Sequence, residues 1–166
     1  MQSTQRPILA VAFDGVISLF GFAEGLDQAP GEMKLIDGMV HCISLAAGER
    51  LRRLAESYEL VWATGWEERA NDHLPSMLGL AERIPVLTFD GRASFGTAHW
   101  KVDAIDEYAG ERPLAWIDDN LDDTCTAWAE SRAAPTLLVP TESDRGLEEG
   151  HVAALLDWVA ASFEPR

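Results

Sequence analysis

Side chains capable of chemistry follow several apolar runs of this 166-residue sequence, at the point where each run ends. Carboxylates from two strand ends can hold a hard cation such as Mg²⁺ through oxygen ligands. A hydroxyl beside a glycine at a strand-to-helix turn can hold a phosphate oxygen, and a lysine adds a point positive charge. The side chains in question are Asp14, Thr64, Lys101, Asp118 and Asp119. Taken together, in this order, they predict a site for phosphoryl transfer.

Short apolar runs typical of buried strands position these residues, and the segments between the runs have the period of helices. The runs are Ile8–Phe13, Leu60–Ala63, Pro85–Phe89, Pro113–Ile117 and Thr136–Val139. Strands that alternate with helices pair in parallel through right-handed crossovers. The predicted fold class is therefore α/β, a three-layer Rossmann-like sandwich with a central parallel sheet. Ligands of such sheets bind beyond the carboxyl ends of the strands.

One segment, at about residues 20–48, interrupts the alternation. It is rich in glycine at its start and then has two apolar stretches, Lys34–Ile36 and Val40–Ile43, joined by an Asp37-Gly38 turn. This pattern predicts a loop followed by a β-hairpin. The hairpin is too short to be a domain, so we expect residues 1–166 to form a single domain with a minimal hairpin insert.

The motifs resemble those of the haloacid dehalogenase (HAD)-like superfamily over nearly the whole chain. The segment AFDGV, Ala12–Val16, resembles the first motif, DxDG[TV]; Thr64 matches the second, Lys101 is the best candidate for the third, and Asp118-Asp119 match the fourth. The strings LVWATGWEERAN and WIDD are similar to a small-cap bacterial subfamily related to HAD domains of RNA-repair proteins. The resemblance implies a phosphomonoester hydrolase that uses Mg²⁺.

The resemblance also implies a role for each site residue. Asp14 would be the general acid and base, and Thr64 and Lys101 would hold the phosphoryl oxygens. Asp118, Asp119 and the main-chain carbonyl of Asp14 would bind Mg²⁺.

The sequence departs from the family pattern at Ala12, where the family has the nucleophilic aspartate. That aspartate attacks phosphorus and divides one hard step into two. Alanine can neither attack nor supply a carboxylate to the metal, so we expect the chain to be inactive or strongly impaired. Asp14 is not a replacement, because the Gly15-Val16 that follows matches the register of the second aspartate. A natural pseudophosphatase and an engineered Asp-to-Ala change both remain open origins.

Some of these residues also have simpler interpretations. Asp-Gly pairs are common turn formers, and Asp118 and Asp119 could instead cap a helix beginning near Leu121. Trp66 and Trp100 stand next to Thr64 and Lys101 in the sequence, but core packing is the better interpretation of both. The four histidines show no metal-binding spacing, and we assign them no role.

The composition restricts the partners. A net charge of −15 and no basic stripe make nucleic acid an unexpected ligand, whereas a small phosphorylated molecule remains compatible because a metal can invert the local sign. The two cysteines, Cys42 and Cys125, lie in apolar patterns and are expected to be buried thiols of a cytoplasmic protein. We expect no membrane segment, since no apolar run approaches the length of a span.

The sequence thus predicts a Mg²⁺-dependent phosphatase scaffold without its nucleophile. Two alternatives remain: a non-catalytic pseudophosphatase that binds a ligand or a protein, and a component that processes nucleic-acid ends in the manner of a 3′-phosphatase.

Overall fold

The computed structural model describes residues 6–21, 30–80, 83–89 and 98–163. The strands are β1 Ile8–Val11, β2 Ser18–Leu19, β3 Glu32–Ile36, β4 Met39–Ile43, β5 Glu59–Trp62, β6 Leu114–Asp118 and β7 Thr136–Pro140. The helices are α1 Leu45–Leu54, α2 Ala70–Leu78, α3 Val102–Ala109, α4 Asp123–Ser131 and α5 Glu149–Phe163, with short 3-10 turns at Glu67–Arg69 and His99–Lys101. None of the helices in the described ranges is both long and apolar enough to cross a membrane.

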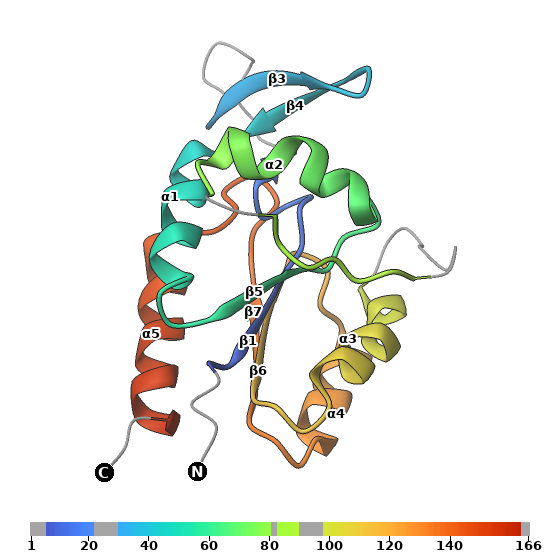
Figure 1. Ribbon diagram of the computed structural model, residues 1–166, viewed down its shortest axis with the longest axis vertical. Coiled ribbons are helices and arrows are strands. Elements are labelled where there is room, and N and C mark those ends of the chain that lie inside the picture. Colours follow the sequence, from blue (N-terminus) through green and yellow to red (C-terminus); the bar gives the residue numbers. More distant parts are fainter. Residues whose placement is uncertain (1–5, 22–29, 81–82, 90–97, 164–166) are drawn as a thin grey trace.

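The central sheet is parallel and has the strand order β5-β1-β6-β7 (Figure 1). All residues of β1 and β6 are buried, because helices cover both faces. The chain passes from β1 to β5 on one side and later to β6 on the other. Strand order therefore reverses at β1, which is where ligands bind in such sheets. The predicted α/β sandwich, with the first strand between those ending near Thr64 and Asp118, is confirmed.

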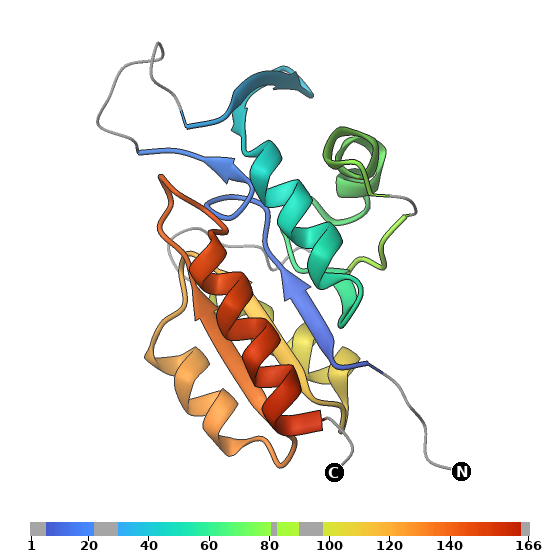
Figure 2. The same ribbon diagram turned by 90° about the vertical axis from the view of Figure 1, so that its left-hand side faces the viewer.

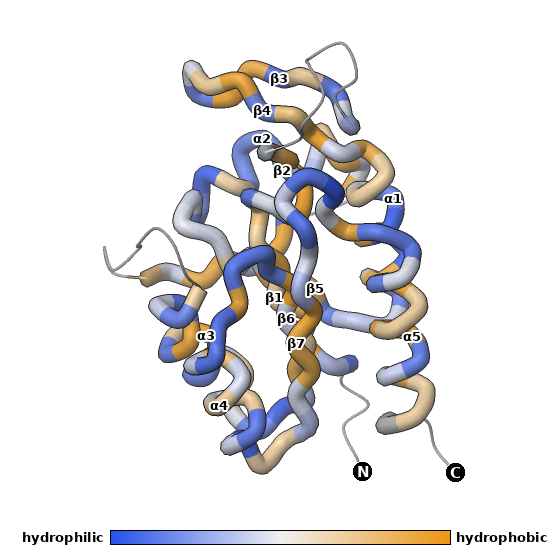
Figure 3. The backbone as a smooth tube through the Cα atoms, turned by 180° about the vertical axis from the view of Figure 1, so that it is seen from behind, coloured by the Kyte–Doolittle hydropathy of each residue, from blue (hydrophilic) through white to orange (hydrophobic). Residues whose placement is uncertain are grey.

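The helices form the two outer layers. Leu51 of α1, Leu74 of α2 and Leu155 of α5 belong to one apolar cluster with one face of the sheet. Ile105 of α3 and Cys125 of α4 belong to a second cluster on the opposite face. Figure 2 shows α1 and α5 side by side on their face, and Figure 3 shows the apolar strands between the helical layers.

A smaller antiparallel sheet, β2-β4-β3, lies beyond the carboxyl ends of the parallel strands (Figure 1). Asp37 and Gly38 both have positive φ, 50° and 82°, as a two-residue type I′ turn requires. The predicted hairpin is confirmed. The pairing of β2 with β4 was not predicted, and residues 22–29 of the expected loop lie outside the described residues.

Two strand predictions need correction. Pro85–Phe89 does not form a strand: it makes one isolated bridge, Val86 with Trp62, and Pro85 has no N–H to extend the ladder. The first strand ends at Val11 rather than Phe13, since the Phe13 carbonyl turns to accept the N–H groups of Ile17 and Ser18.

Candidate active site

A buried ion pair lies at the carboxyl end of β6. The Lys101 Nζ donates to Asp118 Oδ2 at 2.7 Å, and the side chains are 9% and 2% exposed. The other oxygen of Asp118 accepts the N–H of Asn120 at 3.0 Å. Lys101 ends the turn before α3 and so approaches the strand end from the helix layer. The structure thus joins two residues predicted for the site, although 17 positions separate them.

Asp119 lies against the turn that follows β1. A Cβ atom on Gly15 would be only 2.1 Å from Asp119 Oδ2, so this approach requires a glycine. Gly15 also has a φ of 77°, a conformation that other residues rarely adopt. The hydroxyl of Ser143 donates to Asp119 Oδ2 at 2.9 Å. Burial, with a further contribution from Asp118, raises the pKa of Asp119 to about 6.

Asp14 lies in the same turn as Gly15. Its carboxylate interacts electrostatically with Lys101 and Asp118. Its side chain is exposed, yet the protein packed around the carboxylate raises its pKa by desolvation. His41 and Lys101 oppose this effect and Asp118 adds to it. Asp14, Lys101 and Asp118 therefore interact through space at one strand end.

Thr64 follows β5 and is buried, with 3% of its surface exposed. Its hydroxyl oxygen accepts the N–H of Trp66 at 3.3 Å, at the start of the turn that leads into α2. Within the described residues, no hydrogen bond joins Thr64 to the other predicted site residues. It is placed at the neighbouring strand end, where its role stays a prediction.

Ala12 occupies the centre of this arrangement. Its N–H donates to the Ile117 carbonyl at 3.1 Å, which continues the β1–β6 register and places Ala12 level with Asp118. The side chain is 2% exposed and belongs to the apolar cluster that contains Val11 and Phe13. Position 12 therefore places a buried methyl group level with Asp118.

Asp118 and Asp119 are the carboxylates that would hold Mg²⁺ at this strand end, without a third from position 12. In the described part of the chain, no group of three or more His, Cys, Asp or Glu side chains is arranged to hold a metal. Mg²⁺ needs only one or two protein carboxylates, because it keeps several waters. Asp118 and Asp119 would supply two; burial is the main cause of the raised pKa of Asp119, and the charge of Asp118 adds to it.

Three contributors to the site were missed by sequence reasoning. His41 reaches from β4 to bond the Ser18 hydroxyl through Nδ1 at 2.8 Å, and Thr141 donates to the Gly15 carbonyl at 2.8 Å. Ser143 holds Asp119. No local pattern could have identified them, since each contact joins distant parts of the chain.

The capping alternative for the acidic pair is wrong. Asp122 is the N-cap of α4, and its Oδ1 accepts the N–H of Cys125 at 3.0 Å. This hydrogen bond is the main cause of the lowered pKa of Asp122. Asp118, the last residue of β6, and Asp119 both precede the cap.

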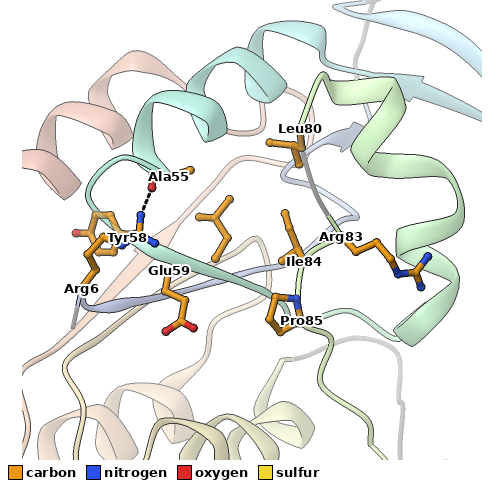
Figure 4. A pocket seen from close by; sticks show the side chains of 9 residues that line it. Arg6, Ala55, Tyr58, Glu59, Leu80, Arg83, Ile84 and Pro85 are labelled. Atoms are coloured by element: carbon orange, nitrogen blue, oxygen red, sulfur yellow. Dashed lines mark hydrogen bonds between the residues drawn. The ribbon is translucent and has the colours of Figure 1, made fainter. Parts of the chain in front are cut away.

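A separate pocket of about 280 Å³ lies at the opposite end of the sheet (Figure 4). Its walls come from Arg6, Tyr58 and Glu59 on one side and from Leu80, Arg83 and Pro85 on the other. Its charged side chains bond within the protein: Arg6 to the Ala55 carbonyl and Arg83 to Glu68. The residues predicted to do chemistry do not line it.

The fold and the cluster of charges define an α/β domain with a phosphatase-type scaffold. A family model described as "HAD domain in Swiss Army Knife RNA repair proteins" matches residues 10–152, and the chain belongs to this family. A search of curated proteins found no match. The crystal structure of a hypothetical protein from Xanthomonas campestris is similar, with 12% identity, 96% of this chain and 90% of that chain covered, and a TM-score of 0.48. So distant a likeness adds nothing about the site.

Proposed function

We propose that this chain is a Mg²⁺-dependent phosphomonoesterase scaffold that binds metal and phosphate but turns over little, because position 12 is alanine. The observation that carries the proposal is the buried Lys101–Asp118 pair, set beside Asp119 and level with Ala12. Membership of a HAD-domain family supports the phosphatase class.

Each side chain has a task in this proposal. Asp118, Asp119 and the main-chain carbonyl of Asp14 would hold Mg²⁺, which would neutralise charge on a bound phosphoryl group. Lys101 and Thr64 hold phosphoryl oxygens, and Lys101 also pairs with Asp118 in its buried place. Asp14, with its raised pKa, gives a proton to the leaving group and takes one from water. An aspartate at position 12 would attack phosphorus.

The substrate class we propose is a small phosphorylated molecule, recognised by the metal and Lys101 and without help from overall charge. Nucleic acid is disfavoured by the net charge of −15. The family description names RNA repair proteins, which favours a phosphorylated RNA end as the second substrate class, with a basic partner supplying affinity. We also propose a cytoplasmic location in a bacterium; the free buried thiols of Cys42 and Cys125 are compatible with it.

A non-catalytic binding module is the second candidate function. It is favoured by the burial of Ala12 within an apolar cluster. Such a module would keep the phosphate pocket or present its hairpin to a protein.

Replacing Ala12 with aspartate tests the proposal. Ala12→Asp should raise Mg²⁺-dependent hydrolysis of p-nitrophenyl phosphate by several orders of magnitude, since loss of a nucleophile removes most of the catalysis of a cooperating set. In the absence of Mg²⁺ the added carboxylate should destabilise the fold, because it is buried near Asp14, Asp118 and Asp119. Mg²⁺ should therefore raise the melting temperature of the variant more than that of the parent.

Ala12→Asn is the matched control. It has the same size as the aspartate variant but no charge to attack or to bind metal, so it should stay inactive and gain no extra stabilisation from Mg²⁺. If the aspartate and asparagine variants behave alike in both assays, the site is a binding module and the phosphatase proposal fails.

A further inference from the structure

The exposed apolar side chains of the described residues gather on the hairpin. Met33, Leu35, Met39 and Val40 are 42%, 73%, 65% and 63% exposed. Phe20 and Leu45, also exposed, flank the hairpin in the chain, whereas the remaining exposed large apolar side chain, Tyr108, lies on α3. Single exposed apolar residues are ordinary, but a group of them on one element marks an interaction surface.

Three of these four side chains, Met33, Leu35 and Val40, share the outer face of the hairpin, where Cys42 is buried. The inner face carries the buried side chains of Ile36, His41 and Ile43, and the exposed Met39 beside the turn. Leu35 pairs with Val40 on the outer face, which would be polar if it were only solvated. Figure 3 shows apolar stretches along β3 and β4, away from the body of the molecule.

The hairpin also has an open backbone edge. In the described residues, β3 is the edge strand of the order β2-β4-β3. The two-residue turn makes Ile36–Met39 the first hydrogen-bonded pair, and such pairs alternate along a hairpin. The main-chain N–H and C=O groups of Met33 and Leu35 therefore point away from β4, towards the open edge.

We propose that this edge binds a second copy of the chain, with the two β3 strands antiparallel about a twofold axis at Met33. The charges on β3 are the reason for proposing a second copy of the chain as the partner. Glu32 and Lys34 flank Met33 symmetrically and share a face, where they form an ion pair 3.2 Å apart. In the twofold pairing, Glu32 lies opposite the partner's Lys34, and Lys34 opposite the partner's Glu32.

Charged residues on an edge strand usually prevent such pairing. Like charges directly opposite each other destabilise a pair of strands, whereas opposite charges stabilise it. Here the spacing makes the strand complementary to itself in one antiparallel register. Met33 then lies opposite the partner's Met33, and Leu35 lies opposite the partner's Gly31. Burial of these apolar side chains supplies the driving force.

Overall charge opposes this association. Two chains of net charge −15 repel each other over the screening length, which falls from about 30 Å at 0.01 M salt to about 10 Å at 0.1 M. We therefore expect association to strengthen as salt is added, because exposed ion pairs contribute little and the apolar contact is insensitive to screening.

Sedimentation equilibrium of the full chain, from micromolar to submillimolar concentration, tests the proposal. The parent should form a dimer. Leu35→Gln should abolish it, and Tyr108→Gln, the matched control at an exposed apolar side chain outside the hairpin, should leave it unchanged. Circular dichroism should show that each variant is folded.

A charge exchange tests the register. Glu32→Lys should weaken the dimer about tenfold in Kd, although it makes the chain less negative, because lysine then faces lysine. Adding Lys34→Glu to that variant should restore the parent value. A chain that stays monomeric at every concentration and salt, a dimer that survives Leu35→Gln, or a double variant no better than Glu32→Lys would each overturn the proposal.

Discussion

The two ends of the parallel sheet both carry charged side chains, but in different environments. At the carboxyl end, Lys101 and Asp118 are paired in the interior, and Asp119 adds a second carboxylate with a raised pKa. At the amino end, Arg112 pairs with Glu59, and their side chains are 27% and 39% exposed. An ion pair of a carboxylate and a cation is thus buried at the carboxyl end and partly exposed to solvent at the amino end.

The difference supports the proposal that the carboxyl end is the functional one. Burying charges costs free energy that good geometry only partly returns. Apolar residues would pack in the same place without that cost, and carboxylates with perturbed pKa values, such as Asp119, cluster at sites that bind or react. The exposed pair at the amino end costs little and needs no functional explanation.

Removing the buried cation should have the largest effect on stability. Lys101→Met keeps most of the volume but leaves the Asp118 carboxylate buried without its partner, at a cost of about 3–5 kcal/mol. Urea denaturation would measure the loss. The double variant Lys101→Met with Asp118→Asn should recover much of it, because neither buried charge remains. Equal stability of single and double variants would mean that the pair is not electrostatically coupled.

The stabilisation by Mg²⁺ should also differ between the two ends of the sheet, although this effect is smaller than that of Lys101→Met. A metal present at ten times its Kd stabilises the fold by about 1.4 kcal/mol, which corresponds to a rise of roughly 3–6 °C in Tm. Asp118→Asn should remove this response in a thermal-shift assay, and Glu59→Gln, the equivalent change at the amino end, should preserve it. A response that persists in Asp118→Asn would place the metal elsewhere.

The sequence predicted the parallel sheet well, because strands buried on both faces are continuous apolar runs. Prediction from the sequence failed where the pairing of a strand depends on residues distant in the chain. β2 is only Ser18 and Leu19, which have no pattern of their own and form a strand because β4 lies beside them. Pro85–Phe89 looked like a strand, but pairing there stops after one bridge.

The position of the site was predictable for a related reason. Parallel strands end at the same edge, so residues directly after the apolar runs had to gather there, as Lys101 and Asp118 do. Residues that reach the site from elsewhere, such as His41 and Ser143, have no sequence signal, since their contacts depend on how the hairpin and the loop after β7 pack. The catalytic and metal-binding roles stay predictions.

The smallest effect is expected at the amino end. Arg112→Met removes the pair with Glu59 and the hydrogen bond, 2.8 Å long, from Arg112 Nη2 to the Arg6 carbonyl. Exposed pairs contribute about 0.2–1 kcal/mol, and the partners left behind can be solvated. The Nε of Arg112 is buried without a hydrogen-bond partner, so its removal offsets part of the loss.

We therefore expect Arg112→Met to lower the free energy of unfolding by about 1 kcal/mol or less, several times less than Lys101→Met. Repeating the urea titration in 1 M salt sharpens the test, since a Debye length of about 3 Å screens the exposed pair far more than the buried one. The Arg112 effect should shrink in salt while the Lys101 effect persists. If both effects shrink alike, water reaches the Lys101–Asp118 pair, and the contrast between the two ends of the sheet would not be one of burial.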